Sequence, residues 1–409
     1  MLTHWIWLAH RPGVNDRMKV RLLQHFRDPE DIYYADGEGY RHVEGMTAEA
    51  EKALKDKDLS GAEAVLESCR REGLHILTFQ DAAYPSKLKN IADPPVLLYY
   101  KGQLPDFDAL PVIGVVGTRK ASAYGMQSAK RMGYQIGKCG GIVVSGMAYG
   151  IDGMAMSGAL TADQITVGVL GCGADIVYPL SNRYLFRDVE KSGCILSEFA
   201  PGTPPMPYHF PKRNRIIAAL SNGVLVVEAP EKSGALITAR QAAEQGRDVF
   251  VVPGNVDVPT CAGSNALLRD GAITARNGWD VISEYLSLYP DKIRTDNAPI
   301  QPAGFTENVQ MQEKQELKVA QKPRKVEKTN RSDRKNEEIP VDNAADKAYH
   351  DTLSEPEKKL VQLLMSGEQL VDDLIAGSGM PTGEVLSLLT LLEIQNIVVR
   401  RPGKRVALK

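Results

Sequence analysis

Cationic side chains and glycine gather around one apolar strand between residues 211 and 239, which read PKRNRIIAALSNGVLVVEAPEKSGALITA. Before the strand come Lys212, Arg213, Asn214 and Arg215, and after it come Ser233, Gly234 and Thr238. Arginine and lysine bind phosphate by charge and hydrogen bonding, and the free amides at a helix start favour the same anion. The spacing therefore predicts a phosphate-binding pocket at the end of a buried strand.

Three other loops carry residues of the same kind. VVGTRKASAYG places Gly117, Thr118 and Arg119 where a strand opens into a helix, and SGMAYGID offers backbone donors at Ser145 and Gly146, with Asp152 as a helix cap. Arg183 follows a further loop, GCGADIVYP, and can join the rim of the pocket. Two simpler interpretations stay open: Arg119 as the surface arginine of a tight turn, and Arg183 as an exposed cation.

Aromatic side chains stand beside the cationic run, in PGTPPMPYHFPKRNR. Tyr208 and Phe210 can stack on unpaired bases, which is how many single-strand binders hold nucleic acid. Core packing is the alternative role for Phe210. His209, between them, is interpreted as a stacking or structural residue rather than a general base.

Other site chemistries lack their motifs. The chain has no GxxxxGK[ST], and no GxGxxG opens the first helix of the apolar-strand region, so we expect neither a Walker-type ATPase nor any bound cofactor. The five cysteines are scattered without a CxxC or a histidine at ligand spacing, which predicts no metal site and reduced thiols in a cytoplasmic protein. The first residues do not resemble a signal peptide, and no apolar run reaches about 18 residues, so we expect neither export nor a membrane span.

The overall charge limits how nucleic acid can be bound. The formal net charge is -2 and the isoelectric point is about 6.4. Such a chain has no global basic field, so an anionic polymer must be held by a local patch.

Six short apolar runs between residues 112 and 278 must position these loops: VIGVVG, GIVVSG, ITVGVLG, CILSEF, GVLVVEA and DVFVVPG. They are continuous rather than alternating, which is typical of strands covered by helices on both faces. The pattern predicts a Rossmann-like α/β fold with a doubly wound, mostly parallel sheet whose loops converge at the carboxyl edge. The preceding segment, TFQDAAYPSKLKNIADPPVLLYYKG, carries strand signals of its own and should extend the sheet edge.

The flanking regions differ from this core in composition. We expect a helical domain at 1–75, the Rossmann-like domain at 76–290, a disordered linker at 291–350 and a winged-helix domain at 351–409. The segment HRPGVNDRMKVRLLQHF resembles a helix-hairpin-helix turn in which Asn15 replaces the second glycine. Asparagine tolerates left-handed backbone angles, so the turn is expected to survive.

The predicted winged helix has little charge on its third helix. Ser354 and Glu357 form a capping box for the first helix, and IVVRRPGKRVAL reads as a hairpin that turns at Pro402-Gly403. The third helix carries Glu384 and Glu393 but no lysine or arginine. The cations lie in the wing instead, at Arg400, Arg401, Lys404 and Arg405. This favours a protein-interaction or accessory role over sequence-specific reading of duplex DNA.

Taken in order, VVGTR, VVSGMAYGID, LGCGADIVYP, ILSEF, FPKRNRII, VVEAPEKSGALITARQA, GRDVFVVPG and GSNALLRDGA resemble the DNA-processing protein A family, also called Smf, over residues 84–275. The resemblance implies a single-stranded DNA-binding protein that dimerises through its Rossmann-like domain. It would protect incoming DNA during natural transformation and load the recombinase RecA onto it. The family's phosphate turn falls on Gly117, Thr118 and Arg119, and its RNR signature on Arg213, Asn214 and Arg215.

A nucleotide-processing enzyme is the alternative function. Rossmann-like phosphoribohydrolases carry a PGGxGT turn followed by an acidic pair, whereas the comparable place here reads EAPEKSGALITA. The DNA-processing family commonly has histidine where this chain has Met156, and a thioether cannot transfer protons. The sequence therefore favours a binding protein without catalytic residues.

Overall fold

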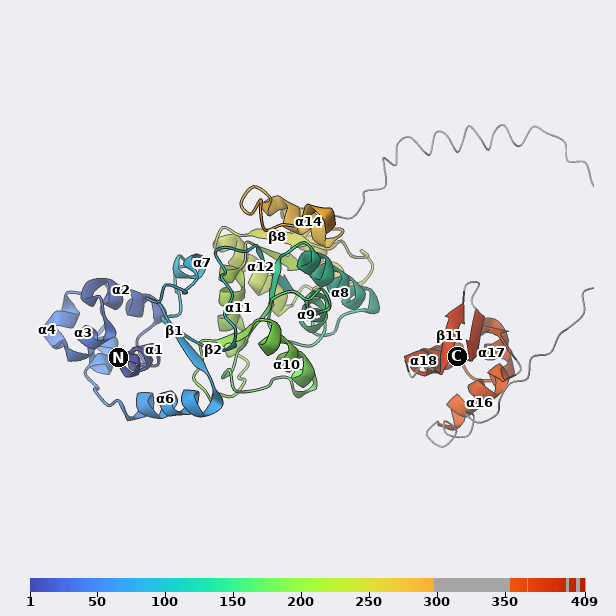
Figure 1. The fold of residues 1–409 in the computed structure, drawn as a ribbon, viewed down its shortest axis with the longest axis horizontal. Helices are drawn as coiled ribbons and strands as arrows, with labels where there is room; N and C mark the ends of the chain where they lie inside the picture. Colours follow the sequence, from blue (N-terminus) through green and yellow to red (C-terminus); the bar gives the residue numbers. More distant parts are fainter. Residues whose placement is uncertain (298–353, 366, 395–396, 402–404, 409) are drawn as a thin grey trace, which may run out of the picture. The chain divides into compact units, whose positions relative to one another are not determined.

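The computed structural model describes residues 1–297, 354–365, 367–394, 397–401 and 405–408. The chain divides into two compact units, 1–309 and 310–409. The first unit contains a helical N-terminal region and a large sheet covered by helices, and the second is a small domain of helices and three strands (Figure 1).

A nine-stranded sheet in the order β1-β2-β6-β5-β4-β3-β7-β8-β9 forms the centre of the first unit. Its parallel core consists of β3 (Val112–Val116), β4 (Ile142–Ser145), β5 (Thr166–Val169), β6 (Cys194–Ser197), β7 (Gly223–Val226) and β8 (Asp248–Val251). These strands are the six predicted apolar runs. The prediction of a doubly wound parallel sheet is confirmed.

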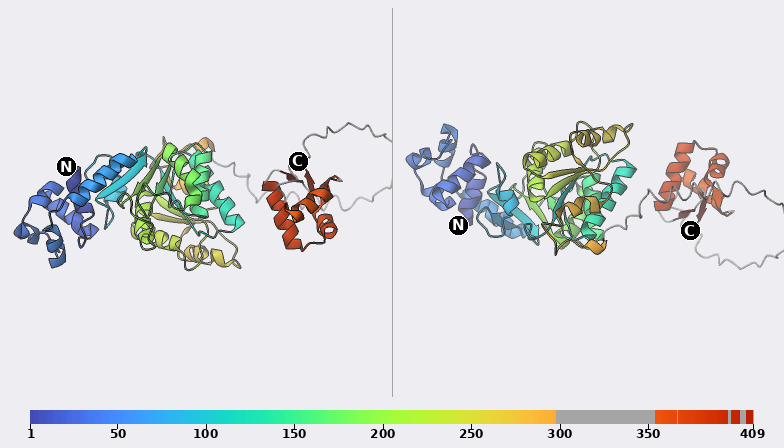
Figure 2. Two further views of the ribbon diagram at one scale, coloured as in Figure 1. Left: turned by 90° about the horizontal axis from the view of Figure 1, so that it is seen from below. Right: turned by 90° about the horizontal axis from the view of Figure 1, so that it is seen from above.

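Helices cover both faces of this sheet (Figure 2). One face packs against α8 (Ala123–Lys138), α9 (Ile151–Thr161), α10 (Arg183–Ser192) and α14 (Gly278–Ile282). The other packs against α11 (His209–Leu220) and α12 (Gly234–Glu244). Both layers of apolar side chains are buried, which is why the strands read as continuous apolar runs.

The strand order reverses between β3 and β7. From β3 the chain proceeds outward through β4, β5 and β6, and from β7 it proceeds in the opposite direction through β8. The loops that follow β3 and β7 therefore diverge to opposite faces and leave a crevice at the carboxyl edge. Ligands of doubly wound folds bind at this switch point.

The two sheet edges are built differently. β1 (His75–Thr78) and β2 (Leu97–Gly102) join antiparallel beside β6, with α7 (Ser86–Lys89) between them, so the predicted extension of the edge is confirmed. At the opposite edge lies the short β9 (Ile273–Thr274), preceded by α13 (Ala262–Arg269). The first unit also has short 3₁₀ turns at Leu180–Asn182 (η1), Pro259–Cys261 (η2), Ser283–Tyr285 (η3) and Thr295–Asn297 (η4).

The N-terminal region is helical, as predicted. Its helices are α1 (Leu2–Ala9), α2 (Asp16–Phe26), α3 (Pro29–Tyr34), α4 (Gly37–Arg41), α5 (Ala48–Leu54) and α6 (Ser60–Glu72). In the turn before α2, Gly13 adopts a φ of 79°. Asn15, however, has φ -74° and caps α2, with its side chain accepting a hydrogen bond from the Met18 amide. The expected left-handed role of Asn15 is therefore wrong, because the residue serves as a helix cap.

The segment after the sheet stays attached to it. Ile293 is buried against the sheet core, and the Arg294 amide donates a hydrogen bond to the Cys139 carbonyl at 2.9 Å. Residues 291–297, which the sequence assigned to a disordered linker, thus belong to the first unit. The rest of the predicted linker, 298–350, lies outside the described residues.

The second unit has the elements expected of a winged helix. They are α16 (Glu355–Leu364), α17 (Val371–Ser378), α18 (Thr382–Ile394), β10 (Gln369–Leu370), β11 (Val398–Arg401) and β12 (Arg405–Leu408), with the strands ordered β10-β12-β11. The Ser354–Glu357 capping box is present. The predicted wing turn at Pro402-Gly403, with Lys404, lies outside the described residues.

Two further features concern the cysteines and the apolar character of the helices. All five cysteines are free and buried. Within the described ranges, no single helix has the length and apolar character needed to cross a membrane, and residues 371–378 and 382–393 meet that test only as a pair bent by 116°.

Candidate functional site

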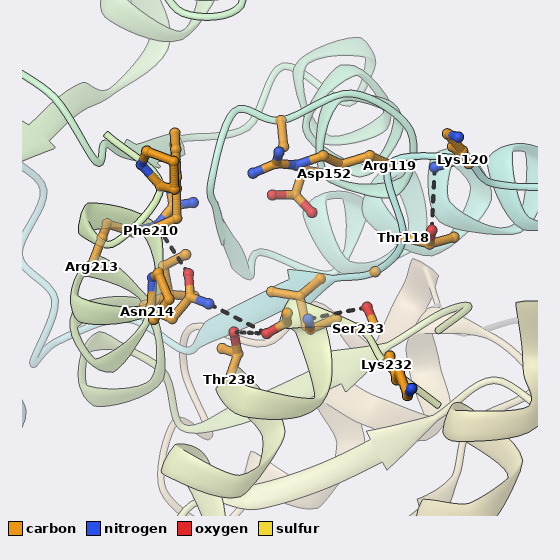
Figure 3. Close-up of a pocket in the computed structure, with 18 of the residues that line it drawn as sticks. Thr118, Arg119, Lys120, Asp152, Phe210, Arg213, Asn214, Lys232, Ser233 and Thr238 are labelled. Atoms are coloured by element: carbon orange, nitrogen blue, oxygen red, sulfur yellow. Dashed lines mark hydrogen bonds between the residues drawn. The ribbon is translucent and has the colours of Figure 1, made fainter. Parts of the chain in front are cut away.

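A cavity of about 510 Å³ opens at the switch point between β3 and β7. Most of its polar side chains come from the loop after β3, the first turns of α11 and the start of α12, and Asp152 of α9 and Tyr178 complete the lining (Figure 3). We call it the phosphate cavity. Its main side chains are Thr118, Arg119, Lys120, Asp152, Tyr178, Phe210, Arg213, Asn214, Lys232, Ser233 and Thr238, with Gly117 and Gly234 contributing backbone.

A buried carboxylate fixes the loop after β3. Glu228, 1% exposed, accepts hydrogen bonds from the Ser122 amide at 3.1 Å and the Ser122 hydroxyl at 2.7 Å. Its backbone carbonyl accepts from the Thr118 amide at 2.7 Å. Gly117 must lack a side chain, because a Cβ there would lie 2.4 Å from Ile151 Cγ1. The loop is therefore rigid, and it presents Arg119 and Lys120 as exposed side chains.

Arg213 forms the floor of the cavity. It is 4% exposed, its Nη1 donates to the Val169 carbonyl, and its Nε donates to Asn214 Oδ1 at 3.1 Å. Burial lowers the pKa of Arg213 to about 10, an effect that the Asp152 carboxylate opposes. Arg213 is thus a fixed cation at neutral pH, already oriented by neutral acceptors.

An aromatic wall adjoins these cations. The guanidinium of Arg119 lies over the Phe210 ring, 5.1 Å from its centre, and the Tyr178 ring lies 5.7 Å from Phe210. Stacking on a ring orients the planar guanidinium while leaving its edge free to donate hydrogen bonds. The wall places flat apolar surface next to positive charge.

The start of α12 closes the third side. Ser233 caps the helix, with its hydroxyl accepting from the Ala235 amide at 3.3 Å. Asn214 Nδ2 donates to the Gly234 carbonyl at 3.4 Å, which ties α11 to this turn. Thr238 Oγ1 lies 3.5 Å from the same carbonyl, and Lys232 is exposed at the mouth. The helix N-terminus adds its positive dipole to the cavity.

The charges that line the cavity are strongly unequal. Four cations contribute, namely Arg119, Lys120, Arg213 and Lys232, against the single carboxylate of Asp152. Asp152 is buried and accepts a hydrogen bond from the Gly146 amide at 3.1 Å. Burial raises the pKa of Asp152. The cavity is therefore suited to an anion.

Two predicted cations, Lys212 and Arg215, lie elsewhere. The Arg215 side chain is 4% exposed, with Nη2 2.5 Å from Glu198 Oε2 and 3.2 Å from Asp16 Oδ2. Lys212 Nζ lies 3.2 Å and 3.4 Å from the same two carboxylates. Both cations are thus neutralised by acids that the sequence of their own loop does not contain. They join α11 to α2 rather than line the cavity.

Three further predicted residues also lie outside the cavity lining. Ser145 Oγ donates to the Val115 carbonyl at 2.6 Å, and the Gly146 amide donates to Asp152. These groups stabilise the turn between β4 and α9. Arg183 is exposed at the start of α10, where its guanidinium lies 4.8 Å from the Tyr184 ring centre.

Sequence reasoning missed several lining residues. Lys120 and Lys232 stand in the stretches RKA and EKSG, directly beside predicted residues, so counting all cations in each helix-start loop would have found them. Tyr178 carried no local signal. His209 is buried with its Nδ1 3.2 Å from the Gly171 carbonyl and its ring 4.1 Å from that of Phe199, consistent with a structural residue.

Comparison with known proteins matches both units. Residues 75–286 match the family described as DNA recombination-mediator protein A, and residues 344–404 match the DprA winged helix domain. Protein Smf of Synechocystis sp. is 32% identical over 412 residues, which cover 98% of this chain and 97% of that protein. DNA processing protein DprA of Bacillus subtilis is 42% identical over 220 residues, covering 54% and 74%. The X-ray structure of DNA processing protein A from Streptococcus pneumoniae has a TM-score of 0.62 and 33% identity, and covers 69% of this chain and 98% of that one.

Proposed function

The chain belongs to the DNA-processing protein A family, also called Smf, and on that premise we propose that it binds single-stranded DNA through the phosphate cavity. We further propose that it protects incoming DNA during natural transformation and loads the recombinase RecA onto it. The observation that carries the DNA-binding proposal is the convergence of four cations and an aromatic wall on one cavity at the switch point.

The chemistry of the cavity favours a single strand. Exposed Arg119 and Lys232 can reach a backbone phosphate, while the start of α12 offers amide donors to the same group. Phe210 and Tyr178 offer faces on which an unpaired base can stack, whereas the bases of a duplex are already stacked on each other. Phosphate contacts and ring stacking carry little sequence information, so binding should be nearly independent of base sequence.

The environment of the carboxylates supports a role without catalysis. Glu228 is occupied by the amide and hydroxyl of Ser122, so it holds the loop instead of facing a substrate. Met156 is fully buried in the sheet core and cannot act as an acid or a base. We propose that the protein is not an enzyme. Incubation of the protein with nucleoside monophosphates tests this proposal. It would be contradicted by an activity that releases free base and copurifies with the protein.

We also propose that the protein acts as a homodimer in the cytoplasm. The edge strand β9 pairs with β8 on one side only, and Ile273 on it is 38% exposed. Unpaired strand edges with apolar side chains are surfaces on which a second copy can add. Light scattering on residues 1–297 tests the dimer, and a monomeric mass at micromolar concentration would argue against it.

For the C-terminal unit we propose an accessory role through protein contacts. Glu384 lies in the first turn of α18, and Leu386 and Leu391 of that helix are 40% and 46% exposed. A helix that reads the major groove relies mainly on arginine and lysine, which α18 lacks. Exposed leucine on that helix suits a protein surface better than a DNA groove.

The central experiment compares single-stranded and duplex oligonucleotides by fluorescence anisotropy. We expect the protein to bind the single strand more tightly and Arg119→Ala to weaken that binding. Arg131→Ala is the matched control, because Arg131 is exposed on α8 and does not line the cavity. Equal affinity of parent, Arg119→Ala and Arg131→Ala proteins would refute the proposed site.

A further inference from the structure

A second cavity, of about 550 Å³, adjoins the phosphate cavity. It lies between the start of α8, the turn before α9, and the first turns of α10. Two large aromatic side chains line it with much of their surface in solvent: Tyr149 is 49% exposed and Tyr184 is 58% exposed. We call this cavity the stacking groove. Exposed tyrosine rings can be covered by flat ligands with little rearrangement, because they lose few rotamers on binding.

The two cavities are neighbours at the carboxyl edge of the sheet. Ala148 lines both of them. The segment from Tyr178 to Asn182 also crosses from one to the other, since Tyr178 lines the phosphate cavity and Asn182 lines the stacking groove. A short segment of chain, from Tyr178 to Asn182, thus borders both cavities, so an extended ligand has only a short distance to cover between them.

The boundary between the cavities is held in place. Asn182 Nδ2 donates to the Met147 carbonyl at 2.9 Å and lies 3.3 Å from the Ala148 carbonyl. Met147 itself has a φ of 59°, an uncommon backbone angle for a residue other than glycine. The hydrogen bonds of Asn182 thus fix the turn that presents Tyr149, so the groove is preformed.

Positive charge lies against one of the two rings. The guanidinium carbons of Arg183 and Arg187 lie 4.8 Å and 5.5 Å from the Tyr184 ring centre. Arg187 Nε is 3.3 Å from the Asp188 carboxylate, whereas Arg183 Nη2 donates a hydrogen bond to the Tyr184 hydroxyl at 3.2 Å, so the other donors of Arg183 remain able to bind a phosphate. An aromatic face beside a cation is the arrangement that binds successive nucleotides of a single strand.

We propose that the stacking groove is a second nucleotide subsite, in which bases next to the phosphate held by Arg119 stack on Tyr149 and Tyr184. This inference rests on the proposed function, because the strand must first occupy the phosphate cavity. The proposal implies that the strand runs along α9 and α10. It also implies that the protein covers more nucleotides than the phosphate cavity alone would hold. Neither ring requires a particular base, so the subsite has no sequence preference.

The test measures affinity as a function of oligonucleotide length. Full-length parent and the Tyr149→Ala, Tyr184→Ala double variant are titrated with labelled oligothymidylates of about 3 and about 12 nucleotides, which bracket the shortest sites of single-strand binders. We expect the short oligomer to bind both proteins equally. The long oligomer should bind the double variant about 5- to 150-fold more weakly for each ring whose stacking is lost.

Two control proteins separate stacking from a general loss of structure. The Tyr149→Phe, Tyr184→Phe double variant keeps both rings and should bind the long oligomer with the parent's affinity. Tyr134→Ala removes another exposed tyrosine, 39% exposed with Lys138 5.7 Å from its ring centre, that lines neither cavity, and should change nothing.

The outcomes are distinguishable. A parent that binds neither oligomer overturns the proposed function and the subsite with it. A parent that binds both while the double alanine variant matches it overturns the subsite alone. Equal weakening for the short and long oligomers also overturns the subsite, because the tyrosines would then act on the phosphate cavity or the fold.

Discussion

Replacing Arg119 with alanine should weaken binding to single-stranded DNA and flatten its salt dependence. Arg119 is exposed in the loop after β3, and its guanidinium lies over the Phe210 ring. Arg215, in contrast, is held in a buried ion-pair network with Glu198. A hydrogen bond to a charged group contributes about 1.5 to 3 kcal/mol, and solvent exposure favours the lower end of that range, so we expect about 12-fold weaker binding at low salt.

The salt dependence gives a second, independent number. Each phosphate contact to a single strand contributes about 0.7 to the slope of log affinity against log salt. Between about 50 and about 200 mM salt, the parent should therefore lose about 2.6-fold more affinity than the variant, which is four raised to the power 0.7. The assay is anisotropy with a labelled oligothymidylate at several salt concentrations, with protein folding checked by thermal unfolding.

Two other substitutions sharpen the interpretation. Arg119→Lys keeps the charge but loses the planar fork, so it should keep the salt slope and recover part of the affinity. Arg131→Ala removes an exposed arginine outside the cavity and should leave both quantities near those of the parent. A folded Arg119→Ala protein with the parent's affinity and the parent's slope would refute the placement of phosphate at this residue.

Three further outcomes follow from the described contacts. Arg215→Ala should lower the free energy of unfolding of the first unit by about 3 kcal/mol, because it leaves the buried Glu198 carboxylate with the half-exposed Lys212 as its remaining cationic partner. A denaturant titration checks this, and a stable variant with a reduced salt slope would assign Arg215 to DNA instead. A fragment of residues 1–297 should keep single-strand affinity within about tenfold of the full chain, or about 1.4 kcal/mol, when both are titrated in parallel. Affinity for single-stranded DNA should rise as pH falls through the pKa of Asp152, which burial raises above its usual value, because protonation removes the single carboxylate that lines the cavity. Asp152→Asn should abolish this part of the pH dependence. A variant whose pH profile matches the parent's would exclude Asp152 as its source.

The sheet could be predicted from the sequence because its signal is local. Each strand is a continuous apolar run that ends at glycine or a small polar residue, and parallel strands bring their carboxyl-end loops to one edge. That argument was enough to place Thr118, Arg119 and Ser233 around a common cavity. The same argument, extended to every cation of each loop, also predicts lysines that line the cavity, such as Lys232.

Long-range charge pairing could not be predicted in this way. Arg215 meets Asp16, 199 residues away in the chain, and no pattern near either residue announces the contact. Asn15 likewise caps α2 because the helix begins at Asp16, a boundary that a glycine-based turn motif does not reveal. Tertiary structure decides that Arg213 lines the cavity and that Arg215 is neutralised inside the fold, since both are arginines of the same stretch.

The geometry of an α-helix nevertheless explains why residues 210–215 contribute both to the phosphate cavity and to the ion pairs with Asp16 and Glu198. Along a helix, residues three apart share a face and residues two apart point about 200° away from each other. Phe210 and Arg213 are three apart, and both face the phosphate cavity. Lys212 and Arg215 are also three apart, and both meet the carboxylates of Asp16 and Glu198 on the opposite side of α11.

The helix α11 therefore joins the phosphate cavity to the N-terminal helices through a single rigid element. The ion pairs of Lys212 and Arg215 fix how α11 lies against α2, and the same helix carries the buried Arg213 that forms the cavity floor. A substitution at position 215 should consequently lower stability while leaving every cation of the cavity in place, whereas one at position 213 removes a cation of the cavity together with its buried hydrogen bond to the Val169 carbonyl. This division also gives the N-terminal region a structural role that does not require contact with DNA, because its Asp16 helps to hold the helix that carries the cavity floor.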